Sequence, residues 1–149
     1  MNFIKPTDCP YYLISRIHLL VTAALKKGFT THGVEKIKPA YLGVLLSLWR
    51  EDGLKLEELS LRAGLEPSTM TGLIDRMERD GFVCRSPDPT DRRVQIIFLT
   101  DNGKKCGAPV MNVVDNVLSD IFSGVSEKDF AQTQALLKQV LANAQEDSK

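Results

Sequence analysis

The stretch from Phe82 to Gly103 reads FVCRSPDPTDRRVQIIFLTDNG, and its pattern differs from the helical spacing on either side of it. Residues 82–85 are predicted to form a short strand and residues 94–99 a second one, because both runs are rich in β-branched and aromatic side chains. Residues 86–93 lie between them and hold two prolines and two aspartates, which are typical of turns. The stretch therefore predicts a β-hairpin with a long polar tip.

Apolar side chains at helical spacing predict four helices before the hairpin. The expected ranges are 10–27, 39–51, 56–63 and 67–80. A glycine follows each range closely, and glycine commonly ends helices. Residues 29–38 are expected to form a loop. The second helix is apolar nearly all round, so we expect it to be buried.

Two further helices are predicted after the hairpin. Thr100 can cap the first of them, and its apolar residues keep helical spacing over residues 110–122. Pro109 lies inside this segment, so we expect the helix to kink or to restart there. The last helix is expected over residues 126–145, where Ser126 begins a pattern similar to a capping box.

The order of these elements indicates a winged helix-turn-helix, because two short helices joined by a glycine-bearing turn directly precede a hairpin. The expected fold class is mainly α with a small β-hairpin wing, flanked by helices at both ends of the chain. In the helix at residues 67–80, one apolar stripe should face the core. It consists of Met70, Leu73, Ile74 and Met77.

The opposite side of that helix has the chemistry needed to read double-stranded DNA. Ser68, Thr69 and Thr71 are small enough to enter a major groove, where hydroxyls bond phosphates or base edges. Arg76 lies in the next turns and is long enough to reach a guanine. Each feature alone also has a plainer interpretation, because hydroxyls cap helices and arginines are mostly exposed.

Other basic residues flank this helix in the predicted fold. Arg92 at the hairpin tip is expected to enter a minor groove, where narrow A·T tracts attract arginine. Arg93 is expected either to enter the minor groove as well or to pair with Asp91 and hold the hairpin. Lys36 and Lys38, before the second helix, are expected to contact phosphates.

The hairpin resembles the wing of the MarR family, the multiple-antibiotic-resistance regulators. That wing has an Asp-x-Arg element, then Leu-Thr, then a glycine; the matching residues are Asp91, Arg93, Leu99, Thr100 and Gly103. Residues 59–65 and 68–81 resemble the helix-turn-helix of the same family. The resemblance runs from about Pro39 to Gly103. The sequence departs from the family pattern after this region, at Lys104, Lys105, Gly107 and Pro109.

The resemblance implies a homodimeric transcriptional regulator that recognises a pseudo-palindromic operator as a ligand-responsive repressor. Residues 39–103 would bind DNA, while helices in residues 1–38 and 104–149 would pair two copies. The residues themselves favour pairing, because the terminal helices carry more apolar surface than a small winged core can cover. The family also implies a small aromatic or anionic effector in a cleft between the two parts.

Four side chains are candidates to recognise an aromatic carboxylate effector: Tyr11, Arg16, His18 and Trp49. For each of them, an ordinary place in the core or on the surface is an equally good interpretation. Some members of the family sense oxidants through a cysteine instead. Cys9, near the start of the first helix, is the candidate here, although an ordinary terminal cysteine is the plainer interpretation.

The composition limits the other function classes. The chain has 19 basic and 19 acidic side chains, and residues 51–105 hold nine basic and eleven acidic ones, so DNA binding is inferred from pattern and not from charge. The two histidines lie on different elements, and no nucleophile motif, phosphate loop or local ligand cluster occurs. We therefore expect no enzymatic activity, cofactor or metal site.

No apolar stretch is long enough to span a membrane, and the first residues lack the layout of a signal peptide. Three widely spaced cysteines suggest reduced thiols, so a cytoplasmic protein is expected. One alternative remains open: a winged helix can contact another protein and no DNA, since a fold alone does not fix a function.

Overall fold

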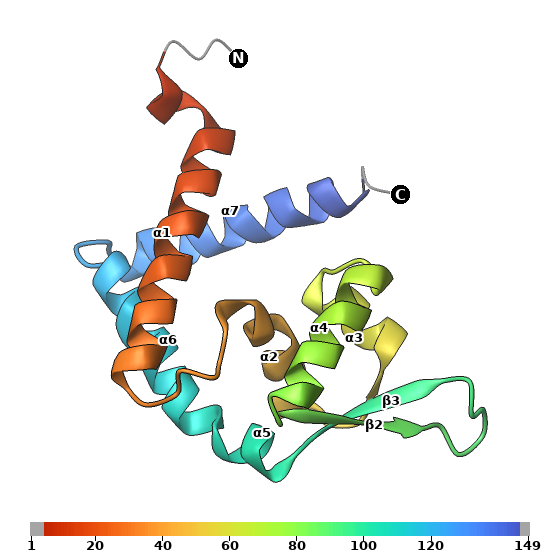
Figure 1. Ribbon diagram of the computed structural model, residues 1–149. Coiled ribbons are helices and arrows are strands. Elements are labelled where there is room, and N and C mark those ends of the chain that lie inside the picture. Colours follow the sequence, from red (N-terminus) through yellow and green to blue (C-terminus); the bar gives the residue numbers. More distant parts are fainter. Residues whose placement is uncertain (1–4, 147–149) are drawn as a thin grey trace. The chain divides into compact units, whose positions relative to one another are not determined.

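The computed structural model describes residues 5–146, and Figure 1 shows its elements. The helices are α1 (Pro10–Thr31), α2 (Leu42–Arg50), α3 (Leu56–Ala63), α4 (Pro67–Arg79), α5 (Asp101–Lys105), α6 (Gly107–Ile121) and α7 (Glu127–Glu146). The 3-10 helices are η1 (Pro6–Asp8) and η2 (Pro39–Tyr41), and the strands are β1 (Leu54–Lys55), β2 (Val83–Pro87) and β3 (Gln95–Leu99). The chain divides into two compact units, Met1–Val117 and Leu118–Lys149. Residues 1–4 and 147–149 of the predicted terminal regions lie outside the described residues.

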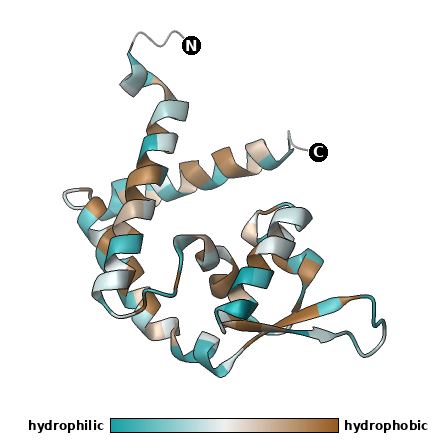
Figure 2. Cartoon of the chain, in the orientation of Figure 1, coloured by the Kyte–Doolittle hydropathy of each residue, from teal (hydrophilic) through white to brown (hydrophobic). Residues whose placement is uncertain are grey.

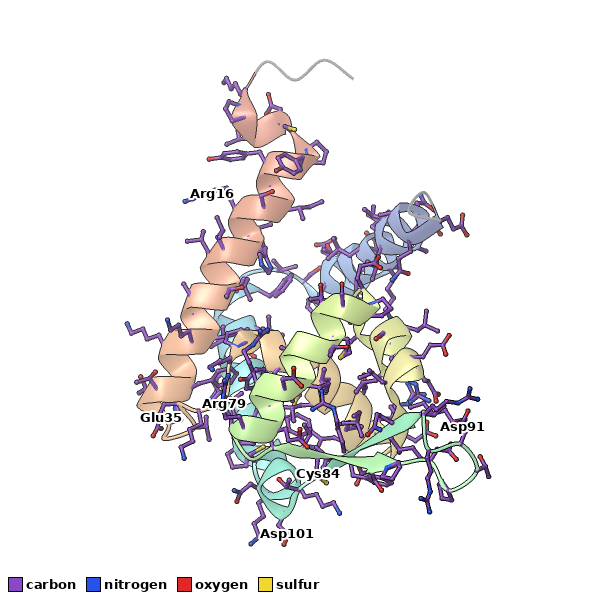
Figure 3. The ribbon with its side chains drawn as sticks, turned by 45° about the vertical axis from the view of Figure 1, so that its right-hand side comes forward. Arg16, Glu35, Arg79, Cys84, Asp91 and Asp101 are labelled. Carbon is purple, nitrogen blue, oxygen red and sulfur yellow. The ribbon has the colours of Figure 1, made fainter. Side chains whose placement is uncertain are left out.

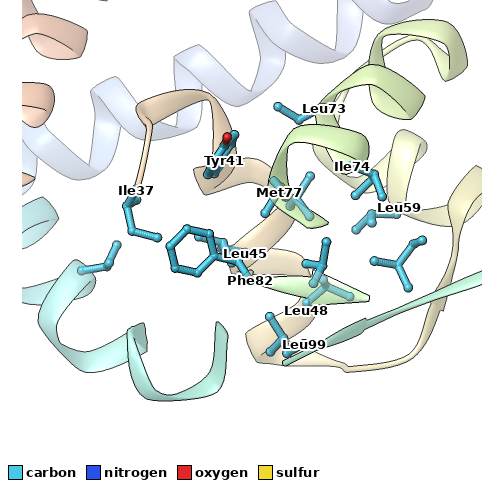
Figure 4. Packing of buried hydrophobic residues seen from close by; sticks show 14 of the residues in the cluster. Ile37, Tyr41, Leu45, Leu48, Leu59, Leu73, Ile74, Met77, Phe82 and Leu99 are labelled. Carbon is cyan, nitrogen blue, oxygen red and sulfur yellow. The ribbon is translucent and has the colours of Figure 1, made fainter. Parts of the chain in front are cut away.

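The core of the first unit lies where α2, α3 and α4 meet the sheet (Figure 4). The predicted stripe of α4 is confirmed, because all four of its residues are buried: Met70, Leu73, Ile74 and Met77. Burial of one large apolar side chain stabilises a fold by about 1.5–3 kcal/mol. This stripe therefore fixes which side of α4 faces inward and leaves the polar side in solvent.

The sheet has three antiparallel strands in the order β1-β3-β2. The predicted hairpin is confirmed as β2 and β3, with Val83 opposite Leu99 and Arg85 opposite Ile97. The prediction of only two strands was wrong, because Leu54 and Lys55 add a short third strand at the edge. A strand of two residues is too short to produce an alternating pattern in the sequence.

The end of the first helix was also predicted wrongly. The helix continues through Gly28 to Thr31. Gly28 serves close packing: a Cβ atom there would lie 2.7 Å from Cγ1 of Val113 in α6. A glycine that ends a helix and a glycine that lets two helices approach each other look the same in a sequence.

Two expectations about the other helices had different outcomes. The second helix begins as η2 and continues as α2, but it is not buried all round, because Leu46 is 46% exposed. The restart expected near Pro109 is confirmed: α5 ends before Cys106, and Pro109 lies in the first turn of α6. Proline is tolerated there because the first amide groups of a helix have no partner within it.

Several apolar side chains are exposed along each of α1 and α7, where Figure 2 shows brown patches. On the amino-terminal half of α1 these include Leu13, Ile14, Ile17 and Leu20. On α7 they include Leu136, Leu137, Val140 and Leu141. The predicted excess of apolar surface on these helices is therefore confirmed for the single chain.

The hairpin leads into α5 through a tight corner. The Thr100 backbone N–H donates to the Phe82 carbonyl oxygen (3.0 Å). The Thr100 hydroxyl donates to the Gly81 carbonyl (2.6 Å) and accepts from the Gly103 N–H (3.1 Å), so the predicted cap is confirmed. Gly103 is buried against the same backbone, and a Cβ atom there would lie 2.1 Å from the Phe82 carbonyl oxygen. Only glycine fits at this position without movement of the backbone.

We predict that Gly103→Ala lowers the free energy of unfolding by about 1–3 kcal/mol, because the added methyl group meets backbone that cannot move aside cheaply. Urea denaturation measures the effect. Gly72→Ala is the matched control, since its Cβ atom would lie 3.7 Å from the nearest group, a terminal nitrogen of Arg76. Alanine is the better helix former, so the control should gain up to about 1 kcal/mol. A Gly103→Ala protein as stable as wild type would contradict the prediction.

Candidate nucleic-acid interface

The solvent side of α4 carries the predicted hydroxyl groups. Ser68, Thr69 and Thr71 are all exposed. The Thr71 hydroxyl donates to the Pro67 carbonyl oxygen (3.0 Å), so it keeps a lone pair free to accept a further bond. The first turns of α4 thus present small polar groups to solvent, and small side chains ease the entry of a helix into a major groove.

Arg76 is exposed on the same helix. Its guanidinium group lies beside Gly72, since a Cβ atom on Gly72 would be 3.7 Å from one of the terminal nitrogens. The arginine therefore extends back toward the amino-terminal half of α4, where the hydroxyls lie. Arg79 extends from the carboxyl end of the same helix (Figure 3).

The loop between β2 and β3 is ordered by its own aspartates. Asp88 is only 7% exposed. Its carboxylate accepts bonds from the Thr90 N–H (2.8 Å) and the Thr90 hydroxyl (2.7 Å), and Lys55 lies 3.5 Å away. These hydrogen bonds, helped by the Lys55 charge, lower the pKa of Asp88 from 3.8 to about 2. The carboxylate is therefore ionised at neutral pH and holds the base of the loop.

Asp91, labelled at the loop in Figure 3, holds Arg93 without burying it. Both oxygens of Asp91 accept bonds from the Arg93 guanidinium, at 3.0 and 3.1 Å. The Arg93 side chain is nevertheless 91% exposed. Arg92 is exposed beside it. The predicted pairing of Arg93 with Asp91 is thus confirmed, and it leaves the guanidinium oriented and open to solvent.

Arg85 joins the wing to α4. One terminal nitrogen lies 2.6 Å from the Asp75 carboxylate and the other lies 2.6 Å from the Glu78 carboxylate. Its backbone N–H also donates to Glu78 (3.2 Å), and its guanidinium donates to the Thr71 carbonyl (3.4 Å). The strand and the helix are therefore linked on the side of α4 that carries the hydroxyls.

The two predicted lysines lie in different settings. Lys38 donates to the Asp80 carboxylate (3.3 Å), which also accepts a bond from the Tyr41 hydroxyl (2.6 Å). The Tyr41 bond, with the nearby lysine, lowers the pKa of Asp80, so this carboxylate is ionised and holds the lysine beside the end of α4. Lys36 is exposed. Contact of either lysine with phosphate stays a prediction.

The four candidate effector residues are not joined to one another. Tyr11, Arg16 and His18 are exposed on α1. Trp49 is partly buried on α2, and its indole N–H donates to the Gly103 carbonyl (2.8 Å). Within residues 5–146, no hydrogen bond or ion pair links any two of the four. A common site for them stays a prediction.

A hollow of about 390 Å³ lies elsewhere in the first unit, between the loop before η2, the turn after α4, and α5. Ile37 and Phe82 supply apolar lining. Lys36, Asn102 and Lys105 supply polar groups, and the two lysines form no ion pair with any residue of the described part. Glu35 and Asp80 also line it, so the hollow combines apolar surface with two basic and two acidic side chains.

Two cysteines, Cys9 and Cys106, are partly buried in different surroundings. Cys9 is the N-cap residue of α1 and is partly buried. Cys106 is also partly buried, and burial raises the pKa of its thiol, which keeps it protonated near neutral pH. A redox role for Cys9 stays a hypothesis.

Sequence analysis missed Arg85, Asp88 and Tyr41 as residues that shape this surface. One signal was present for Arg85: it follows Val83 by two residues, so both point to the same face of the hairpin. Val83 is buried there, and a charged group at such a position needs partners. The partners of Asp88 and Tyr41 depend on the folded path of the loop and on distant residues.

Comparison with known proteins places this geometry in a family. The MarR family model matches residues 37–94. The transcriptional repressor MdtR of Bacillus subtilis is 29% identical over 92% of this chain and 91% of its own length. The transcriptional regulator SarZ of Staphylococcus saprophyticus is 32% identical over 68% of this chain and 70% of its own length. The structure of reduced AbfR bound to DNA is similar at 26% identity, with a TM-score of 0.71 over 89% of this chain and 90% of AbfR.

None of the helices within residues 5–146 is both long and apolar enough to cross a membrane.

The buried Asp88 carboxylate predicts a pH-dependent contribution to stability. Because its pKa falls from 3.8 to about 2 on folding, the contribution is complete above about pH 4 and is lost as the pH falls through 2. Asp88→Asn should therefore be less stable than wild type at pH 7, and the difference should disappear near pH 2. Urea unfolding from pH 7 to pH 2 measures it.

Asp101→Asn is the control for this measurement, because the Asp101 carboxylate is exposed at the start of α5. Asp88→Asn should be less stable than this control at pH 7, and the difference between the two variants should disappear near pH 2. An Asp88→Asn protein whose deficit is the same at pH 7 and at pH 2 would show that the ionised carboxylate does not stabilise the loop.

Proposed function

The chain belongs to the MarR family of transcriptional regulators, and from this premise we propose that it acts as a homodimer that represses transcription from a pseudo-palindromic operator. The observation that carries the proposal is the pairing of two exposed surfaces on one scaffold. These are the hydroxyl-bearing side of α4 and the arginine-bearing tip of the wing. Repression is favoured because MdtR, which is similar over nearly its whole length, is a repressor.

In this proposal α4 is the recognition helix and lies in the major groove. Ser68, Thr69 and Thr71 contact phosphates or base edges, and Arg76 donates to a guanine. The apolar stripe holds the other side of α4 in the core, so the helix has only one side to offer. The similarity to AbfR, whose structure is bound to DNA, supports this role.

The wing is proposed to enter the adjacent minor groove. Arg92 and Arg93 both expose their guanidinium groups at its tip, and Asp91 fixes the direction of Arg93 before DNA arrives. An oriented side chain loses less conformational freedom on binding than a mobile one. Lys36 and Lys38 are proposed to contact phosphates nearby.

Two copies are proposed to pair through their terminal helices, with residues 1–38 and 104–149 forming the dimerisation region and residues 39–103 the DNA-binding domain. The exposed apolar side chains of α1 and α7 support pairing, since a lone chain would leave them in water. A two-fold dimer presents two recognition helices, as a palindromic operator requires.

The regulator is proposed to respond to a small organic anion with an apolar body. The hollow beside the carboxyl end of α4 offers Lys36 and Lys105, which form no ion pair within residues 5–146, for the anionic group and Phe82 for the apolar part. Of the two carboxylates in the same lining, Asp80 is already paired with Lys38. The hollow supports this role better than Tyr11, Arg16, His18 and Trp49, which no hydrogen bond or ion pair joins within residues 5–146. An anion bound there would occupy Lys36 and compete with its phosphate contact.

The proposal includes no catalytic step, and the chain would act in the cytoplasm, where operator DNA is found. The alternative of a winged helix that only contacts proteins fits the surface less well. Protein interfaces bury an apolar centre, whereas the exposed side of α4 is polar and the wing tip carries two guanidinium groups.

We predict that two arginine substitutions weaken DNA binding in different ways. Arg76→Ala should cost about 1–3 kcal/mol and relax the preference at particular base pairs. Arg92→Ala should weaken binding to all related operators and reduce the slope of log affinity against log salt by about one unit. Binding constants on an operator library at two salt concentrations separate these effects.

Arg50→Ala is the matched control, because Arg50 is an exposed arginine at the end of α2 and belongs to neither α4 nor the hairpin. It should bind DNA as wild type does. If Arg92→Ala also binds as wild type does, the wing makes no contact with DNA. The same assay with added benzoate tests the effector, and unchanged affinity across such small acids would remove the proposed site.

We predict that Leu137→Glu breaks the dimer, because a carboxylate would enter an apolar interface without a partner. Native mass at micromolar concentration should be that of two chains for wild type and of one chain for the variant. Ala135→Glu is the control, since Ala135 is exposed and helical spacing puts it on the opposite side of α7. It adds the same carboxylate and should leave the dimer intact. A wild-type protein with the mass of a single chain would refute pairing.

A further inference from the structure

Arg85 occupies an unusual position for a charged residue. It lies opposite Ile97 on the face of the hairpin that buries Val83, Ile97 and Leu99. Its side chain is only 21% exposed. Charged side chains with so little exposed surface are usually paired. The partners of Arg85 therefore indicate its role.

Those contacts all lead to one side of α4. Asp75 and Glu78 are three residues apart and therefore neighbours on the helix surface, and Arg85 lies 2.6 Å from each. A planar guanidinium with two fixed edges suits such a bridge better than a single ammonium group does. The Thr71 carbonyl, 3.4 Å from the same guanidinium, belongs to a residue proposed to face DNA.

We propose that Arg85 is a positioning residue for DNA recognition, which fixes the wing at one angle to α4 so that both contact the duplex together. This inference rests on the proposed function. The corner at Thr100 and Gly103 anchors the base of the hairpin to the turn after α4. On the β3 side, β1 pairs with Ile96 and Ile97, and Lys55 lies 3.5 Å from Asp88. Arg85 supplies the link from β2 to α4 itself.

The length of the wing makes this link to α4 important. Arg92 is seven residues beyond Arg85, a distance of at most about 23 Å at 3.3 Å per residue. A rotation of about 10° at Arg85 would move a tip 20 Å away by about 3–4 Å, which exceeds the tolerance of a hydrogen bond. Without the bridge, the angle between α4 and the wing would be less closely fixed, and so would the spacing of their DNA contacts.

A different role is also chemically reasonable for the same contacts. Asp75 is 62% exposed and Glu78 40% exposed, and both would repel DNA phosphates. Arg85 offsets that charge. If charge compensation were its whole role, removal of the two carboxylates would help DNA binding, whereas the positioning role requires them as the other half of the bridge.

The test is a double-mutant cycle with full-length protein, on a duplex selected from a random library by wild type. The proteins are wild type, Arg85→Met, the wing variant Arg92→Ala/Arg93→Ala, and the combination. Arg85→Met should weaken binding about tenfold in wild type and by less than about twofold in the wing variant, since coupling reveals residues that act through one another. An equal loss in both backgrounds would overturn the proposal.

A second variant removes the two carboxylates that bind Arg85. Asp75→Ala/Glu78→Ala keeps Arg85 and removes its partners, so the positioning role predicts weaker operator binding. Unchanged or tighter binding would overturn it in favour of charge compensation. If wild type selects no duplex at all, the proposed function fails and the role of Arg85 fails with it, an outcome distinct from an uncoupled cycle.

Discussion

Gly103 lies so close to the Phe82 carbonyl oxygen that the backbone leaves no room for a side chain there. A Cβ atom at this position would lie 2.1 Å from that oxygen, a distance that non-bonded atoms do not reach. The contact holds α5 against the turn that follows α4. The Trp49 indole bonds to the carbonyl of the same glycine, so α2 is tied to this point as well. Three elements from distant parts of the chain thus meet at one backbone contact.

The wing sequence has a separate physical purpose at each of its matching positions. Leu99 enters the core, Thr100 caps α5 and holds the Gly81 carbonyl, and Gly103 permits the close approach. At the other end of the hairpin, Asp91 orients Arg93 while leaving it exposed. The motif therefore gives the hairpin an anchored base and an exposed arginine at its tip. A protein that contacts both DNA grooves needs both features.

Features that depend on residues close together in the sequence were predicted correctly. The stripe from Met70 to Met77 and the cap at Thr100 were predicted because spacing and side-chain chemistry specify them. The strand at Leu54, the role of Gly28 and the partners of Arg85 were not, because each depends on a neighbour distant in sequence. The candidate site residues on α4 and the wing were assigned by pattern. The hollow near Lys105 could not be, since three separate segments form it.

Hydroxyl-radical footprinting of a selected operator tests most directly whether two winged domains read the duplex as a pair. A two-fold dimer should protect two equivalent tracts whose centres lie about 10 base pairs apart, or a multiple of that spacing. Each tract should include a minor-groove segment next to the major groove that α4 occupies. A single asymmetric tract, or uniform weak protection along the whole duplex, would contradict symmetric recognition by α4 and the wing.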